Sequence, residues 1–439
     1  MRSSNQSSWI HYLLILHVAC GMAAWIACAA AAGTDGAAGS HMTPVVREVE
    51  VLLDHANPAM GTAKLTVELG APFNPELPTI FVIADAQQFY VQRGAMAGIQ
   101  ARYFNDEVNV AGIIGRGFTK EFILATTAAD GEPVWTKAWS VFNSDQWVED
   151  IEVVRQALMG PGGRICLFGQ SGGGFLVHQY LARYGRHVDR AVTSSAVNPF
   201  IVGELGLNSD RFWSDIGRNQ PGLQEQVLEV LSQYSHRRPE ILMTLQRQNF
   251  FVQPSRLPEE RLRLIHALAG KDLNTFMAIK EAYQVEPVRR FLESPQGIPI
   301  RVRLFEFIYP ARILDRLSDD AVYPDLENQK NFAEPLLELR AAGKISGPSW
   351  DRWALHALDT EVLVLNGVQD HTSDYRAAAV LAYCYPRGHL FLADDDHQFH
   401  AMAEGGVHSN LVRTFLISGP ESDAYRSSLA AAERFRWKE

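Results

Sequence analysis

The chain has 439 residues, of which 47% are hydrophobic and 21% are charged, proportions that are ordinary for a globular enzyme. This length allows one large α/β domain with an inserted lobe, or two modest domains. The formal net charge of −10 argues against a nucleic-acid or anionic-membrane partner, because either would require a basic stripe and the sequence contains none.

The first 33 residues have the layout of a secretory signal peptide. A polar start that carries Arg2 precedes an apolar run over 13–32, which ends in small residues. We therefore expect a secreted or periplasmic protein with a linker over 34–44 and no membrane contact beyond the leader. An uncleaved membrane anchor is the alternative. Because the run ending at Met42 resembles a cloning remnant, a true start at Met42 would instead predict a cytoplasmic protein.

Four cysteines provide no disulfide framework. Cys20 and Cys28 lie in the leader, Cys166 lies on a predicted strand, and Cys384 lies near the C-terminal end. A Cys166–Cys384 bridge stays open, although a central strand usually holds a free, buried thiol.

The first elements after the linker are strands. Residues 45–53 and 63–69 alternate between apolar and polar, which predicts an antiparallel pair. The continuous apolar runs over 79–83 and 108–114 predict strands covered on both faces. A helix is expected over 145–159, since its apolar residues recur on one side.

The most informative stretch follows this helix. An apolar strand enters Gly169-Gln170-Ser171-Gly172-Gly173, and an amphipathic helix leaves it. This pattern is typical of a nucleophile elbow, in which a serine occupies a strained strand-to-helix turn. The alternative is a glycine-rich strand-to-helix turn whose serine has no catalytic role.

The rest of the chain resumes the same rhythm around a long helical insertion. Strands are expected at 189–196, 361–367 and 389–393, and a closing helix at 408–416. We predict a mostly parallel doubly wound sheet with an inserted α-helical cap. The α/β core comprises 45–197 and 359–439, the latter including a C-terminal helix, and the cap comprises 198–358.

Partners for the serine are expected in loops after late strands. A serine hydroxyl needs an imidazole to take its proton and a carboxylate to orient the imidazole. Asp370 follows the strand over 361–367, and His397 follows the strand over 389–393. We therefore predict Ser171 as nucleophile, Asp370 as orienting acid, and His397 as general base and acid.

Each assignment has an alternative. In the first, Asp374 is the acid and Asp370 is a helix N-cap, although Asp374 is expected deeper in the following helix. In the second, His400 replaces His397 as the base. The cluster Asp394-Asp395-Asp396-His397-x-x-His400 would also suit a divalent metal, but the elbow would then go unexplained. We expect neither a metal nor another cofactor.

An Asp150-x-Glu152-x-x-Arg155 helix precedes the elbow, and Gly367-x-x-Asp370 and Asp396-His397 follow it. Together with the elbow, these motifs resemble the prolyl aminopeptidase branch of the α/β-hydrolases. The resemblance implies an α/β-hydrolase fold, no cofactor, and acidic cap residues that bind a substrate amino terminus. Glu204, Glu281 or Glu286 would supply them.

One loop departs from the branch, whose members usually carry His-Gly-Gly-Pro-Gly after the third strand. Here the stretch is Ala84-Asp85-Ala86-Gln87-Gln88. The oxyanion hole would then use the Gly172 amide together with Ala86 or Gln87, and losing one donor typically costs about 10²–10³ in rate.

Together these features predict a serine hydrolase that cleaves an ester or amide of a small molecule or short peptide through an acyl-enzyme. An aminopeptidase is the specific expectation from the resemblance. The alternatives are a carboxylesterase or lipase, an acyltransferase, and a catalytically silent hydrolase-like binding protein. The sequence leaves the oligomeric state open.

Overall fold

A computed structural model describes residues 45–88, 90–217, 220, 222–310, 314 and 322–438, and all statements below concern this part of the chain. The predicted signal peptide over 1–33 and the linker over 34–44 lie outside it.

The described residues form an eight-stranded sheet in the order β1-β2-β4-β3-β5-β6-β7-β8. β1 and β2 pair antiparallel, as do β2 and β4, whereas all later pairs are parallel. The predicted mostly parallel sheet is therefore confirmed. The strands are β1 (Val45–Leu52), β2 (Thr62–Leu69), β3 (Thr79–Ile83), β4 (Asn109–Ile114), β5 (Ile165–Gln170), β6 (Val188–Ser194), β7 (Glu361–Gly367) and β8 (Gly388–Ala393).

The predicted antiparallel pair is also confirmed, and its register follows from the apolar alternation. Val49 lies opposite Leu65, and Val51 lies opposite Ala63. All four side chains are buried on the same face of the sheet. The turn between the strands closes at Gly61, which has φ 94°, a value that favours glycine.

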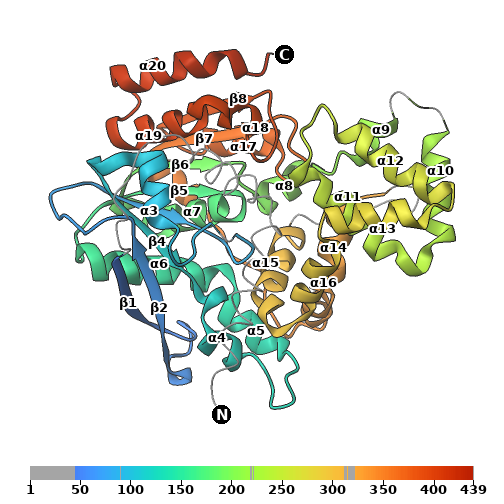
Figure 1. The fold of residues 1–439 in the computed structure, drawn as a ribbon. Helices are drawn as coiled ribbons and strands as arrows, with labels where there is room; N and C mark the ends of the chain where they lie inside the picture. Colours follow the sequence, from blue (N-terminus) through green and yellow to red (C-terminus); the bar gives the residue numbers. More distant parts are fainter. Residues whose placement is uncertain are drawn as a thin grey trace, which may run out of the picture.

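Helices cover both faces of the sheet (Figure 1). Apolar residues on one face of the strands pack against α6 (Ser144–Met159), α7 (Ser171–Tyr184) and α17 (Tyr375–Tyr383). Those on the other face pack against α3 (Met96–Ile99), α19 (Val407–Ser418) and α20 (Asp423–Ala432). Because both faces are covered, the strands β3, β5 and β7 are buried along their whole length rather than on alternate residues.

Between β6 and β7 the chain is helical, and its distal part forms a lobe with a core of its own. Figure 1 shows α9 to α13 standing to one side of the sheet, while α14 to α16 lie between this lobe and the core. Buried residues such as Phe212, Leu245 and Phe276 form the lobe's separate apolar cluster. The helices are α8 (Pro199–Leu205), α9 (Phe212–Gly217), α10 (Leu223–Gln233), α11 (Arg238–Phe251), α12 (Leu257–Ala269), α13 (Leu273–Ala282), α14 (Val285–Glu293), α15 (Ile298–Ile308) and α16 (Pro324–Ala341).

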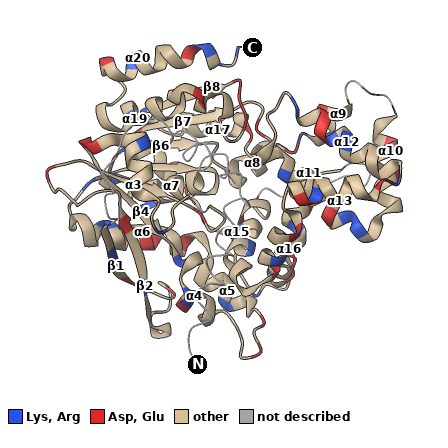
Figure 2. Cartoon of the chain, viewed as in Figure 1, with Lys and Arg blue, Asp and Glu red and all other residues tan. Residues whose placement is uncertain are grey.

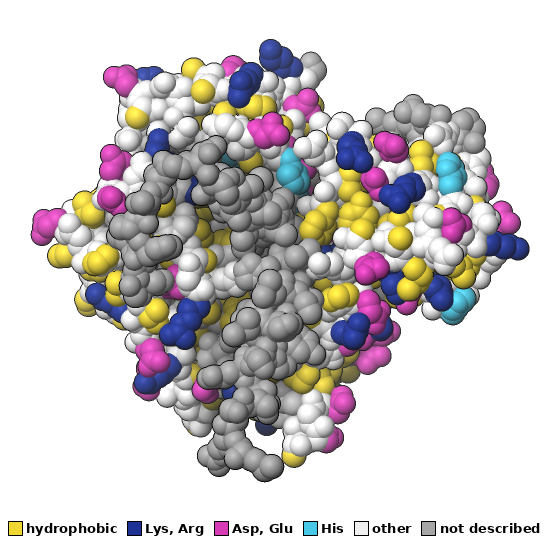
Figure 3. Space-filling model, in the orientation of Figure 1, with side chains coloured by type: hydrophobic (Ala, Val, Ile, Leu, Met, Phe, Trp, Pro, Cys, Tyr) yellow, Lys and Arg dark blue, Asp and Glu magenta, His cyan; other side chains and the backbone are white. Residues whose placement is uncertain are grey.

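Charged side chains of both signs are interspersed over the lobe (Figures 2 and 3). Lys280 on α13 pairs with Glu240 on α11 within the lobe, and Arg238 on α11 pairs with Glu327 on α16 outside it. Among the described helices, none has both the length and the apolar character needed to cross a membrane. Cys166 and Cys384 are both free and buried, so they form no bridge.

Candidate active site

The predicted tight turn is present at the junction of β5 and α7. β5 ends at Gln170, and α7 begins at Ser171, whose φ of 52° is unusual for a residue with a side chain. A Cβ on Gly169 would lie 2.6 Å from the carbonyl oxygen of Gly173, and one on Gly173 would overlap the carbonyl oxygen of Ile83. Glycine is therefore needed at both positions because backbone, which cannot move aside, occupies the space.

Gln88 joins the loop after β3 to this turn. Its Oε1 accepts hydrogen bonds from the amides of Asp85 at 2.8 Å and Gly173 at 3.0 Å. Its Nε2 donates to the carbonyl of Gln170 at 2.7 Å. The side chain is buried and fixes both segments around Ser171. Sequence reasoning missed Gln88, since a glutamine two residues beyond a candidate oxyanion donor carries no motif of its own.

Asp370 and His397 lie side by side in the loops after β7 and β8. Asp370 Oδ2 lies 2.7 Å from His397 Nδ1. Asp370 Oδ1 accepts hydrogen bonds from the amides of Thr372 at 2.7 Å and Ser373 at 2.9 Å, and Oδ2 also accepts one from the Ser373 hydroxyl. Both side chains are buried. The carboxylate is thus held rigidly, and it can orient the imidazole with Nε2 as the remaining ring nitrogen.

The electrostatics of this pair suit a base that gains charge. Burial raises the pKa of Asp370, but the charge of His397 and the hydrogen bonds from His397 and Ser373 outweigh it, so the net pKa lies below the usual range. Burial lowers the pKa of His397, but Asp370 and, more weakly, Asp396 and Asp325 raise it to a net value above 6.5. The environment therefore favours an imidazolium next to an ionised carboxylate.

The two alternatives lie elsewhere. Asp374 does not lie deeper in the helix, as the sequence suggested, but precedes it and caps α17 by accepting a hydrogen bond from the amide of Arg376. His400 forms a separate pair with Asp396 at the start of α18 (His400–Ala403). Of the two histidines, His397 lines the cavity that also contains Ser171, and His400 is not part of its lining.

This cavity has a volume of about 180 Å³ and lies between the sheet and the helical insertion. Ser171 and His397 line it from the core. Its apolar walls come largely from α14 and α15, and its polar wall comes from α11 and α16. The apolar lining includes Val288, Phe291, Leu292, Ile300, Leu304 and Phe307, and the polar lining from α11 and α16 includes Gln246, Arg247, Asp325, Asn328 and Gln329.

The acidic residue that the insertion presents to the cavity is Asp325, not one of the three that the resemblance suggested. Glu204 pairs with Arg352, Glu286 pairs with Arg289, and Glu281 is exposed to solvent. None of the three lines the cavity, whereas Asp325 does. Its position at the start of a helix, where acidic residues commonly cap, concealed it in the sequence.

Asp325 and Asp210 form a buried acidic pair. The Asp325 amide donates to Asp210 Oδ2 at 2.9 Å, and Asp325 also accepts a hydrogen bond from Gln246. Burial is the largest cause of the raised pKa of Asp325, against which the hydrogen bonds from Gln329 and Gln246 act. Burial and the charge of Asp325 raise the pKa of Asp210 to about 7.

The candidate oxyanion donors have unequal surroundings. Gly172 is the second residue of α7, so its amide is one of the first four of the helix, which have no partner within it. The amide of Ala86 donates to Asp85 Oδ1 at 2.6 Å. Gln87 lines the cavity. An oxyanion would therefore have to compete with a carboxylate for the Ala86 amide.

The Asp-x-Glu-x-x-Arg segment of α6 stabilises the fold rather than lining the cavity. Asp150 forms a buried two-point ion pair with Arg116. Glu152 does the same with Arg155, which also donates to the carbonyls of Gly160, Pro161 and Gly163 just before β5. The motif therefore fixes the approach to the elbow strand.

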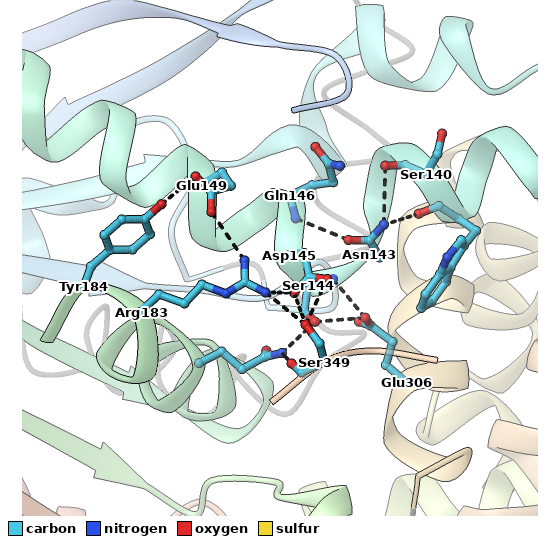
Figure 4. A network of polar contacts seen from close by, with 12 residues as sticks. Ser140, Asn143, Ser144, Asp145, Gln146, Glu149, Arg183, Tyr184, Glu306 and Ser349 are labelled. Atoms are coloured by element: carbon cyan, nitrogen blue, oxygen red, sulfur yellow. Dashed lines mark hydrogen bonds and ion pairs between the residues drawn. The ribbon is translucent and has the colours of Figure 1, made fainter. Parts of the chain in front are cut away.

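A second polar network ties the insertion to the helices around the elbow (Figure 4). Glu306 on α15 accepts hydrogen bonds from both the amide and the hydroxyl of Ser144, at 2.9 Å each. The Ser144 hydroxyl in turn accepts one from Gln179 on α7 at 2.7 Å. Figure 4 also shows Arg183 pointing between Asp145 and Glu149.

Within the described residues, no group of three or more His, Cys, Asp or Glu side chains is arranged to hold a metal ion.

Comparison of the sequence with protein-family models and with curated proteins finds no match. Among solved structures, the chain is similar to an esterase from a Rhodococcus species, with 15% identity, a TM-score of 0.44, and coverage of 85% of this chain and 99% of that one. A carboxylesterase from Bacillus subtilis shows 11% identity, a TM-score of 0.41, and coverage of 94% and 100%. An alpha/beta hydrolase from a Medee basin deep-sea metagenome library shows 10% identity, a TM-score of 0.41, and coverage of 82% and 96%. Identities of at most 15% and TM-scores below 0.5 are too low for these likenesses to indicate what this chain does. The strand order and the turn at Ser171 are those of the α/β-hydrolase fold.

Proposed function

We propose that the protein is a serine hydrolase in which Ser171, His397 and Asp370 act together. The observation that carries the proposal is that His397, whose Nδ1 lies 2.7 Å from Asp370 Oδ2, lines the same cavity as Ser171. The positive φ of Ser171 also supports a catalytic role for this serine, because strained backbone conformations of this kind cluster at active sites.

The proposed reaction has two halves. In the first, Ser171 Oγ attacks the carbonyl carbon of an ester or amide while His397 Nε2 takes the hydroxyl proton. The tetrahedral intermediate collapses, the bond to the leaving group breaks, and His397 returns the proton to the leaving alcohol or amine. In the second, water attacks the acyl-enzyme by the same proton transfers and releases the acid. Asp370 keeps the ring in the required tautomer and stabilises the imidazolium.

The cavity favours a small substrate with an apolar part and a cationic part. Its apolar side would accommodate an acyl chain or a ring, and its volume of about 180 Å³ excludes a folded polypeptide. Asp325 provides a carboxylate in the cavity that Ser171 and His397 also line. An amino group beside the scissile bond would be attracted by Asp325, as an aminopeptidase requires.

A carboxylesterase is the second candidate, because the apolar wall suits an acyl chain and the same three residues cleave esters. An acyltransferase would use the same acyl-enzyme with a different acceptor. The engaged amide of Ala86 favours a further alternative, a silent binding protein without a working oxyanion hole.

Labelling with a fluorophosphonate probe tests the enzyme directly. We expect the folded protein to be labelled on Ser171 and the Ser171→Ala variant to remain unlabelled. Absence of labelling in the folded wild type, or unchanged labelling of the variant, would contradict the proposal and support the binding protein.

Parallel assays of aminoacyl-naphthylamides and p-nitrophenyl esters then separate peptidase from esterase. If Asp325 binds an amine, Asp325→Asn should raise KM for aminoacyl substrates by about tenfold or more, while KM for neutral esters stays nearly constant. Glu286→Gln is the matched control, because that acid is also in the insertion but lies outside the cavity lining. Equal effects on both substrate classes would refute the amine-binding role.

A further inference from the structure

Asp85 places a buried carboxylate beside two of the candidate oxyanion donors, Ala86 and Gly172. Its Oδ1 accepts the hydrogen bond from the amide of Ala86 at 2.6 Å. Its Oδ2 lies against Gly172, where a Cβ would overlap it. This oxygen is buried and has no hydrogen-bond partner within the described chain. The carboxylate thus lies at the N-terminal end of α7, whose positive field would otherwise serve an oxyanion.

An arginine of the helical insertion holds Asp85 there. Arg303 on α15 donates from Nε to Asp85 Oδ1 at 2.8 Å, and both side chains are fully buried. Arg303 also pairs with Glu306, which is anchored to Ser144 at the start of α6 (Figure 4). One guanidinium therefore serves two acids, and its positive charge is shared between them.

We propose that Asp85 restrains the reaction at Ser171 by occupying the Ala86 amide and by placing negative charge next to the developing oxyanion. The proposal rests on the function proposed above. Two effects add. A donor that is already engaged stabilises the oxyanion less, and a like charge inside a water-excluded site is weakly screened. Asp85 would then set how electrophilic a carbonyl must be before it reacts, which favours activated esters over amides.

Two variants test the two effects in turn. Asp85→Asn removes the charge and leaves an oxygen that can accept from Ala86 and Arg303. Asp85→Ala also frees the Ala86 amide. We expect the kcat for a p-nitrophenyl ester, per active serine titrated with a fluorophosphonate, to increase in the order wild type, Asp85→Asn, Asp85→Ala. The kcat of Asp85→Ala should exceed that of wild type by about tenfold or more, up to the 10²–10³ that one donor is worth. KM should change by less than about threefold, because Asp85 is not part of the cavity lining.

Glu361→Gln is the matched control. It removes another buried acid that is paired with an arginine, Arg387, but at the start of β7, at the opposite end of the parallel strands from the Ser171 turn. Its kcat per active serine should equal that of wild type. This control separates a charge effect at the turn from a general effect of disturbing a buried ion pair.

The outcomes are distinct. A kcat of Asp85→Asn at or below that of wild type overturns the restraint and leaves the serine hydrolase intact. If neither wild type nor any variant is labelled or active, the proposed function itself fails, and the restraint fails with it. Should Asp85→Ala not fold, Asp85→Asn alone decides, since its shape is unchanged and Arg303 keeps its contact with Glu306.

Discussion

Replacing Asp370 by Asn is the most direct test of how the buried pair works. The Asn Oδ1 can keep the hydrogen bonds from the amides of Thr372 and Ser373, so the loop should be preserved. Its Nδ2 would then face His397 Nδ1 and donate to it. His397 would carry its proton on Nε2 and could not accept one from Ser171.

The expected loss follows from the 2.7 Å separation of the Asp370 and His397 atoms. At an effective dielectric constant of about 20, two unit charges at that distance attract by about 6 kcal/mol. In a serine protease triad the same change lowers kcat by about 10⁴, which corresponds to about 5 kcal/mol and is therefore comparable to this energy. We therefore expect kcat for a p-nitrophenyl ester to fall by about 10³–10⁴, with KM nearly unchanged.

The neighbouring pair provides the control. Asp396→Asn makes the same change beside His400, which is not part of the cavity lining. Its kcat should stay within about threefold of wild type. Steady-state kinetics on both variants, with folding checked by circular dichroism, measure the difference. If Asp370→Asn retains more than about a tenth of the wild-type kcat, or if Asp396→Asn loses as much, the assignment of the base to His397 is wrong.

Three further results are expected. The kcat/KM should rise with pH through an apparent pKa above 6.5, because His397 must be unprotonated to act as base and its surroundings raise its pKa. A pH–rate profile measures this midpoint, and a midpoint below 6.5 argues against the expectation. Gly173→Ala should lower the free energy of unfolding by about 1–3 kcal/mol or more, because its Cβ would overlap the Ile83 carbonyl, whereas Gly98→Ala has open space and should be neutral or slightly stabilising in urea unfolding. Asp210 has a pKa of about 7 in the folded state against an ordinary 3.8, so the folded state binds its proton more tightly and stability falls as pH rises between these values. The free energy of unfolding of Asp210→Asn should therefore exceed that of wild type by on the order of 4 kcal/mol at about pH 8 and equal it below the ordinary pKa. If the unfolding free energies of the two proteins depend equally on pH, this expectation is wrong.

The sheet was predictable because its signals are local. The buried runs at 79–83 and 361–367 coincide with β3 and β7, and the alternating segments at 45–53 and 63–69 correspond to β1 and β2. The turn at Ser171 was predictable as well, since glycine is the one residue that fits against the backbone at Gly169 and Gly173.

The contacts across the cavity were not predictable, because they depend on how the insertion packs. Asp325 reaches the cavity only through the docking of α16 against α11, which no short motif encodes. The contact between Asp85 and Arg303 joins residues that are 218 positions apart. In the same way, Asp374 caps α17 because the helix begins one residue after it, a boundary that sequence patterns locate poorly.

α15 contributes to two tasks at once. Ile300, Leu304 and Phe307 line the cavity. On the same helix, Arg303 bonds to Asp85 in the loop after β3, and Glu306 bonds to Ser144 at the start of α6. Any repacking of this helix to admit a larger acyl group would shift the guanidinium that holds the loop beside the serine. Mutant libraries aimed at new substrate selectivity should therefore vary residues of α14 and α16 first and leave α15 unchanged.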